Sequence, residues 1–204
     1  EEAEDIVNGL KGILADIESG ALKIDMEAED IHTFIEGELT KRIGDNGKRL
    51  HTSRSRNDQV ALDIKLYLKK EVVNVKSLVV ELIKVIADKA EKYSDTVMPG
   101  YTHLQRAQPI TFGHHLLAYG EMLLRDVSRL EDCLKRMDEM PLGSCALAGT
   151  TYPIDRTVTA DLLGFERITN NSLDGVSDRD FCIEFASVLS IIMVHLSRFS
   201  EEII

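Results

Sequence analysis

A helical pattern runs unbroken through residues 58–93, DQVALDIKLYLKKEVVNVKSLVVELIKVIADKAEKY. Apolar side chains recur along it at three- and four-residue steps: Val60, Ile64, Leu68, Val72, Val75, Val79, Leu82 and Ile86. This spacing places them on one face of a helix far longer than the average in globular proteins. Such a helix is stable only when other long helices cover its apolar face, so the stretch predicts a bundle of long helices.

The rest of the chain adds helical segments and no convincing strand. Helices are predicted at about residues 6–20, 27–43, 109–140, 153–163 and 177–204. Gly164 is a natural helix stop, and Ser177 with Asp180 resembles a capping box. The sequence therefore predicts an all-α fold, a long antiparallel helical bundle. Residues 191–194 are apolar nearly all round the helix, which predicts packing against other subunits as well as within the chain.

Composition excludes several classes of protein. Of the 204 residues, 44% are hydrophobic and 29% are charged, as in a globular chain and unlike a disordered one. The net charge of −11 argues against binding to nucleic acid, which needs a basic surface. We find no signal peptide and no apolar run that we judge long enough to cross a bilayer, so no membrane partner is expected.

The cysteines, the histidine pair and the chain ends carry smaller signals. Three cysteines, an odd number without metal-type spacing, predict reduced thiols in a cytoplasmic protein: Cys133, Cys145 and Cys182. His114 and His115 lack a carboxylate at ligand spacing, so we expect neither a metal nor another cofactor. The chain begins without Met and stops within an apolar helical pattern, so we expect an internal piece of a longer protein.

A polar stretch between two predicted helices is the first candidate site. Residues 98–110, MPGYTHLQRAQPI, place Thr102 beside His103 in what we predict to be a short loop. A histidine and a hydroxyl on a loop held by two rigid helices suit proton-transfer chemistry.

A second polar stretch precedes the longest helix. Residues 50–59, LHTSRSRNDQ, set Arg54 and Arg56 against a helix N-terminus, which would suit a carboxylate or a phosphate. The alternative is that Asn57 or Asp58 merely caps the helix while the arginines form surface ion pairs. Composition alone gives the two interpretations equal weight.

Two further stretches carry weaker signals. The small residues of 140–151, MPLGSCALAGTT, allow the backbone to approach either a ligand or another helix closely, but their spacing is not that of a nucleotide-binding loop. Residues 170–180, NNSLDGVSDRD, are typical of turns.

Taken in order, these segments resemble the argininosuccinate lyase family of the fumarase/aspartase superfamily, which includes the delta-crystallins. The resemblance covers nearly the whole chain. It rests mainly on residues 51–58, 100–110, 141–144 and 171–174, supported by residues 29–32 and 178–181.

The resemblance implies that argininosuccinate is cleaved to arginine and fumarate by anti elimination, a step of arginine biosynthesis and the urea cycle. It assigns His103 the role of a catalytic acid–base, and Thr102, Asn57 and Arg56 roles in substrate binding. An anionic intermediate needs arginines, amide donors and helix N-termini, and these stretches supply them. Three further residues are expected to be scaffolding: Asp30, His51 and Ser53. Ser144 lies in a matching segment and receives no role.

The resemblance also implies an assembly. Members of the superfamily are homotetramers whose active sites combine regions of three subunits, with Arg56 and Asn57 expected across a subunit boundary from His103. Residues 1–56 correspond to the end of an N-terminal helical domain and residues 57–204 to an incomplete central bundle domain. The family's catalytic serine loop is absent from these residues, so we expect the 204-residue chain to be inactive alone.

Two alternatives stay open. One is a non-catalytic, crystallin-like structural relative, which could keep most of these motifs. The other is a sister lyase acting on adenylosuccinate or aspartate, against which the sequence SRSRND at residues 53–58 argues.

Overall fold

The computed structural model describes residues 1–204, which fold as two compact units, Glu1–Ser55 and Arg56–Ile204. Helices dominate both units, so the all-α prediction is confirmed. The first unit contains α1 (Glu2–Glu18), α2 (Ile31–Ile43), α3 (Asp45–Lys48) and a 3-10 turn, η1 (Arg49–His51).

The first unit packs α1 against α2. Ile13 and Leu39 are buried, and a Cβ on Gly9 would lie 2.5 Å from Leu39, so the two helices approach closely at this glycine. Helix α2 begins later than residue 27, where we predicted it, because the Asp30 carboxylate accepts a hydrogen bond from the Thr33 amide and so caps the helix.

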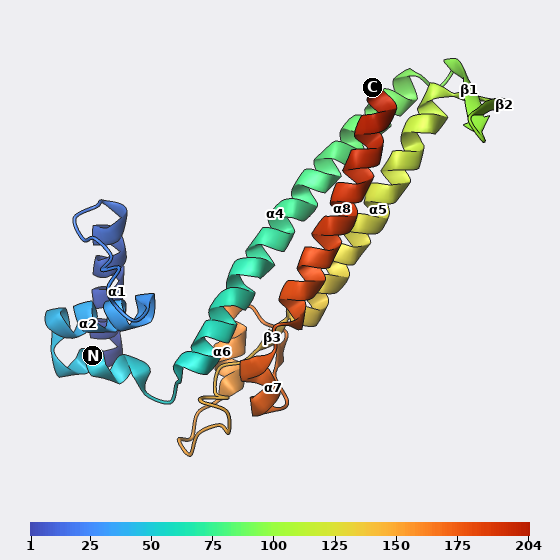
Figure 1. The fold of residues 1–204 in the computed structure, drawn as a ribbon. Coiled ribbons are helices and arrows are strands. Elements are labelled where there is room, and N and C mark those ends of the chain that lie inside the picture. Colours follow the sequence, from blue (N-terminus) through green and yellow to red (C-terminus); the bar gives the residue numbers. More distant parts are fainter. The chain divides into compact units, whose positions relative to one another are not determined.

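Three long helices form the second unit: α4 (Arg56–Lys92), α5 (Phe112–Met137) and α8 (Asp180–Ile203). They run side by side with alternating directions (Figure 1), as the predicted antiparallel bundle requires. Each contributes to one apolar core, represented by Val72 and Ile86 of α4, Leu130 of α5, and Phe185 and Val188 of α8. Predicted helix 58–93 therefore corresponds to α4, two residues longer at its start and one shorter at its end.

The stretch around His103 is a β-hairpin, and our prediction of a plain loop was wrong. Strand β1 (Val97–Thr102) pairs antiparallel with β2 (Gln105–Thr111) at the end of the bundle where α4 passes to α5 (Figure 1). The next helix therefore begins at Phe112 rather than at residue 109, and the Thr111 hydroxyl caps it by accepting the His114 amide at 3.1 Å.

The opposite end of the bundle is closed by short elements. Strand β3 (Glu139–Met140) pairs parallel with β4 (Arg167–Ile168), and helices α6 (Arg156–Leu163) and α7 (Ser172–Ser177) lie beside them (Figure 1). Gly164 ends α6 in the left-handed conformation, as predicted.

Two predictions for residues 170–180 were wrong. Residues 172–177 of this stretch form a helix, α7, and Asn171 caps it by accepting the amides of Leu173 and Asp174. Ser177 and Asp180 form no capping box, because the Ser177 hydroxyl donates to the Leu173 carbonyl inside α7, and α8 begins at Asp180 without a side-chain cap.

Helix α8 shows that the prediction of no apolar run long enough to cross a bilayer was wrong. With 24 residues, it is long enough and apolar enough to cross a bilayer. In this structure one face of α8, including Phe181 and Ile192, joins the apolar core, and His195 binds the buried Asp126 of α5. These contacts favour a bundle helix over a membrane span.

Candidate functional site

The candidate residues form two groups at opposite ends of α4. Arg56 and Asn57 open the helix, whereas Thr102 and His103 follow its last residue in the hairpin. A helix of 37 residues is about 55 Å long. One chain therefore does not bring the two groups together.

His103 and Leu104 form the tip of the hairpin. Both have positive φ, 51° and 59°, between strands that pair up to Thr102 and Gln105. Two successive residues with positive φ make the tight hairpin turn that normally takes Asn and Gly. Leucine rarely adopts this conformation, and backbone strain of this kind collects at functional sites. The turn presents His103 to solvent, and Leu104 is 99% exposed.

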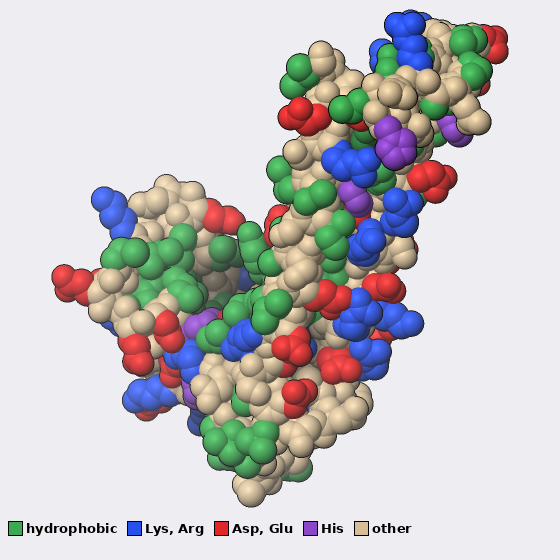
Figure 2. Space-filling model, turned by 45° about the vertical axis from the view of Figure 1, so that its right-hand side comes forward, with side chains coloured by type: hydrophobic (Ala, Val, Ile, Leu, Met, Phe, Trp, Pro, Cys, Tyr) green, Lys and Arg blue, Asp and Glu red, His purple; other side chains and the backbone are tan.

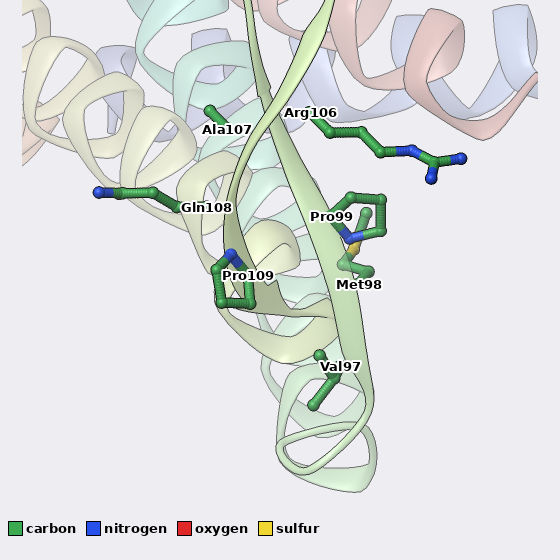
Figure 3. A pocket seen from close by; sticks show the side chains of 7 residues that line it. All are labelled: Val97, Met98, Pro99, Arg106, Ala107, Gln108 and Pro109. Atoms are coloured by element: carbon green, nitrogen blue, oxygen red, sulfur yellow. The ribbon is translucent and has the colours of Figure 1, made fainter.

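Two hollows adjoin the hairpin. One, of about 330 Å³, is lined by Val97, Met98, Pro99, Arg106, Ala107, Gln108 and Pro109 (Figure 3). In Figure 3 the Arg106 and Gln108 side chains extend in opposite directions from the hairpin. This first hollow is thus mainly apolar, with polar groups at its margin.

The second hollow, of about 560 Å³, lies between the hairpin and helices α5 and α8, and Thr102 contributes to its wall. His115 Nε2 lies 3.5 Å from Glu202 Oε2 there. Burial, followed by the charge of Glu202, raises the pKa of the neighbouring Tyr119. His115 is therefore placed against α8.

At the other end of α4, Asn57 and Asp58 reach a distant loop. Asn57 Nδ2 donates to the Ala146 carbonyl at 2.8 Å. The Asp58 carboxylate is fully buried and accepts the amides of Gly143 at 3.1 Å and Cys145 at 2.7 Å. These bonds go beyond the local capping that we considered as the alternative.

Arg56 makes a contact within its own helix. Its guanidinium donates to the Gln59 side chain at 2.8 Å. Arg56 and Asn57 therefore lie together in the first turn of α4, where the helix dipole favours an anion.

Arg156, which the sequence did not single out, also holds this loop through hydrogen bonds. Its guanidinium donates to the carbonyls of Leu142 at 2.7 Å, Met140 at 3.3 Å and Thr169 at 3.0 Å. Burial lowers its pKa, and the Asp58 carboxylate opposes that shift. No sequence signal could have identified it, because its acceptors are mostly backbone carbonyls.

Ser144, which received no role, is fully buried and lies 3.5 Å from the Thr169 hydroxyl. A Cβ on Gly143 would lie 2.8 Å from the Arg156 side chain, and a Cβ on Gly175 would lie 2.9 Å from the Ser144 hydroxyl. The small residues that we expected to permit close approach thus make room for side chains from other parts of the chain.

The three residues expected to be scaffolding lie in the first unit. Asp30 caps α2, and His51 Nδ1 lies 3.4 Å from Glu36 Oε2. Ser53 has a positive φ of 58°. The Asp30 cap is local to α2, whereas the contact of His51 joins η1 to α2, and both suit scaffolding residues.

Two buried charged clusters in the bundle were also missed. Lys65 of α4 is 1% exposed and donates to the Glu139 carbonyl at 3.1 Å. Asp126 of α5 is fully buried and lies 2.6 Å from His195 Nδ1 and 2.9 Å from Arg129. The only sign of these clusters in the sequence is a charged residue at a position where the helical pattern calls for an apolar one.

The chain resembles known proteins over its whole length. The argininosuccinate lyase of Heliobacterium mobile is 63% identical over 203 residues, and that of Desulforamulus reducens is 60% identical over 204. Each match covers 100% of this chain and 44% of the relative, so the chain spans less than half the length of these relatives.

Solved structures agree with the fold. A crystal structure of EDDS lyase in complex with formate superposes with a TM-score of 0.89 at 32% identity, covering 99% of this chain and 39% of that one. A fumarate lyase:delta crystallin from Brucella melitensis, bound to cobalt, matches with a TM-score of 0.70 at 22% identity, covering 84% and 41%, and supports the fold alone. A family model described as Lyase matches residues 1–204. With the long-helix bundle and both groups of candidate residues inside that match, the chain belongs to the lyase family.

Proposed function

We propose that the protein cleaves argininosuccinate to arginine and fumarate. The observation that carries this proposal is the identity of 60–63% with argininosuccinate lyases across the full 204 residues, which include both candidate groups. A variant of EDDS lyase, similar in fold at 32% identity, has been crystallised with fumarate, the product expected here.

The chemistry is an anti elimination across a carbon–nitrogen bond. A base removes the proton from the carbon next to a carboxylate, and the electron pair first forms an aci-carboxylate. The C–N bond then breaks as an acid protonates the departing guanidinium nitrogen. We assign His103 to acid–base transfer and Thr102 to hydrogen bonding with the substrate. An exposed hairpin tip suits this role, because it can enter a site formed by other chains.

We assign Arg56 and Asn57 to binding of the substrate's carboxylates. They lie in the first turn of a 37-residue helix, where the dipole and the guanidinium both attract anions. This local attraction matters because the net charge of −11 would repel a dicarboxylate at long range.

The active site then requires more than one copy of the chain, since the two groups lie about 55 Å apart along α4. Figure 2 shows apolar side chains at the surface of the bundle, and exposed examples occur on each long helix: Leu78, Val85, Leu117, Leu124, Ile183 and Met193. Association of copies would cover them. We propose a homotetramer in the cytoplasm, with residues 1–56 belonging to an N-terminal domain and residues 57–204 to the central bundle.

The test is turnover by the full-length protein, followed by the ultraviolet absorbance of fumarate. We expect His103→Ala to lower kcat by about 10²-fold or more, as loss of a general acid–base does. His114→Ala, which removes another exposed histidine, should leave kcat nearly unchanged.

Two outcomes would overturn the assignment. Turnover of adenylosuccinate or aspartate in place of argininosuccinate would identify a sister lyase. A folded oligomer that turns over none of the three would support the crystallin-like alternative.

A further inference from the structure

Asp58 is the buried acid of the first turn of α4, next to the proposed substrate residue Asn57. It is 0% exposed, and one of its oxygens, Oδ2, accepts two backbone amides, those of Gly143 and Cys145. A buried carboxylate is costly unless such bonds satisfy it. The two bonds fix the conformation of residues 142–146, which we call the 142–146 segment.

Arg156 holds the 142–146 segment from its other side. Its Nε donates to the Leu142 carbonyl at 2.7 Å, and its side chain fills the space beside Gly143, whose φ is 88°. The segment is thus held between a buried carboxylate that binds its amides and a guanidinium that binds its carbonyl. Neither side chain can reach solvent without breaking these bonds.

The far end of the segment returns to α4. The Ala146 carbonyl accepts Asn57 Nδ2 at 2.8 Å. A carboxamide has a donor end and an acceptor end, and its partners decide which way round it lies. The position of the Ala146 carbonyl therefore helps to set how the Asn57 carboxamide is turned.

We propose that Asp58 is a positioning residue for substrate binding: through the 142–146 segment it orients the Asn57 carboxamide toward the substrate's carboxylate. The inference rests on the proposed function, because it assigns Asn57 a substrate contact. It adds a residue that acts without touching the substrate, and it gives the buried loop a role in affinity.

The test is a double-mutant cycle in the full-length protein with argininosuccinate as substrate. We expect Asp58→Ala to raise KM by about tenfold and Asn57→Ala to raise it at least as much. The double variant should resemble Asn57→Ala alone, because the segment has no carboxamide left to orient. Asp58→Asn keeps an acceptor oxygen for both amides and should stay within about threefold of the wild type.

Val72→Ala is the matched control for lost stability. Val72 is fully buried on the same helix, so this variant loses stability without changing the first turn of α4. The fold losses in kcat/KM caused by Val72→Ala and by Asn57→Ala should multiply in the variant that carries both. If the fold losses in kcat/KM caused by Asp58→Ala and Asn57→Ala also multiply, Asp58 acts only through stability and the proposal is overturned.

A second readout does not depend on turnover. Alkylation of Cys145 by iodoacetamide, located by mass spectrometry, reports on the segment, because the Cys145 amide is bound to Asp58. We expect faster labelling in Asp58→Ala and little change in Asp58→Asn or Val72→Ala. Unchanged labelling in Asp58→Ala overturns the positioning role even if the enzyme is active. If labelling changes but the wild type does not cleave argininosuccinate, the proposed function has failed, and the substrate role of Asn57 fails with it.

Discussion

Mixing two impaired variants of the full-length protein tests whether the active site is shared between chains. One variant carries His103→Ala in the hairpin and the other carries Asn57→Ala at the start of α4. The 37 residues of α4 keep these positions about 55 Å apart in any one chain. Each site must therefore take its hairpin from one copy and its α4 N-terminus from another.

The expected activity follows from random assortment. In an equal mixture, half of the hairpins and half of the α4 N-termini are intact, so about 25% of the sites receive both intact groups. Because neither variant alone has a site with both groups intact, the mixture should recover about a quarter of the wild-type kcat/KM. The assay is fumarate release after the two variants are coexpressed, or unfolded and refolded together.

Thr102→Ala provides the matched control. A mixture of Thr102→Ala with His103→Ala places both defects in the same hairpin, so every site is damaged and no activity should return. Recovery in this control, or none when His103→Ala is mixed with Asn57→Ala in demonstrably mixed oligomers, would refute the argument from the length of α4.

The remaining predictions concern stability, measured by urea unfolding of the 204-residue chain. His195→Ala should cost about 3 kcal/mol, since it removes a partner 2.6 Å from the buried Asp126 carboxylate; a loss under about 0.5 kcal/mol would contradict this. Burial raises the pKa of Cys133 to about 11 from 9.0. The folded state thus holds this proton more tightly than the unfolded state, so the free energy of unfolding should fall by about 2 to 3 kcal/mol between these pH values, and Cys133→Ala should lose that part of the dependence. Gly143→Ala should cost about 2 kcal/mol or more, because φ is positive and the new Cβ would lie 2.8 Å from a side chain. Gly164→Ala, with positive φ and open space, should cost only about 1 kcal/mol, and equal losses would refute the steric contribution.

The helices were predictable and the hairpin was not, for a physical reason. Apolar side chains at helical spacing must be buried together, so residues 58–93 identify α4 nearly to its ends. Most hairpin residues are exposed, and the sequences of its two strands do not alternate between apolar and polar side chains. Pro99 and Pro109 pair with each other, and the turn uses His103 and Leu104 instead of Asn and Gly. Each of these features argued against strands.

The candidate site was predictable as separate groups of residues. Its motifs identify Arg56, Asn57, Thr102 and His103, but they say little about what supports these residues. The Asp58 carboxylate binds amides 85 and 87 residues away in the chain. Every non-proline residue carries a backbone amide, so such a partner leaves no trace in the sequence.

The length of helix α4 also sets the distance between the two groups of candidate residues. Inserting one residue within it would shift the hairpin by about 1.5 Å along the axis and turn it by about 100° around it. Neither change could be absorbed locally, since α4 and α5 pack together along their length. The number of residues between Asn57 and the hairpin is thus as strict a requirement as the identity of either end, and substitutions on the exposed face of α4 should be tolerated where insertions are not.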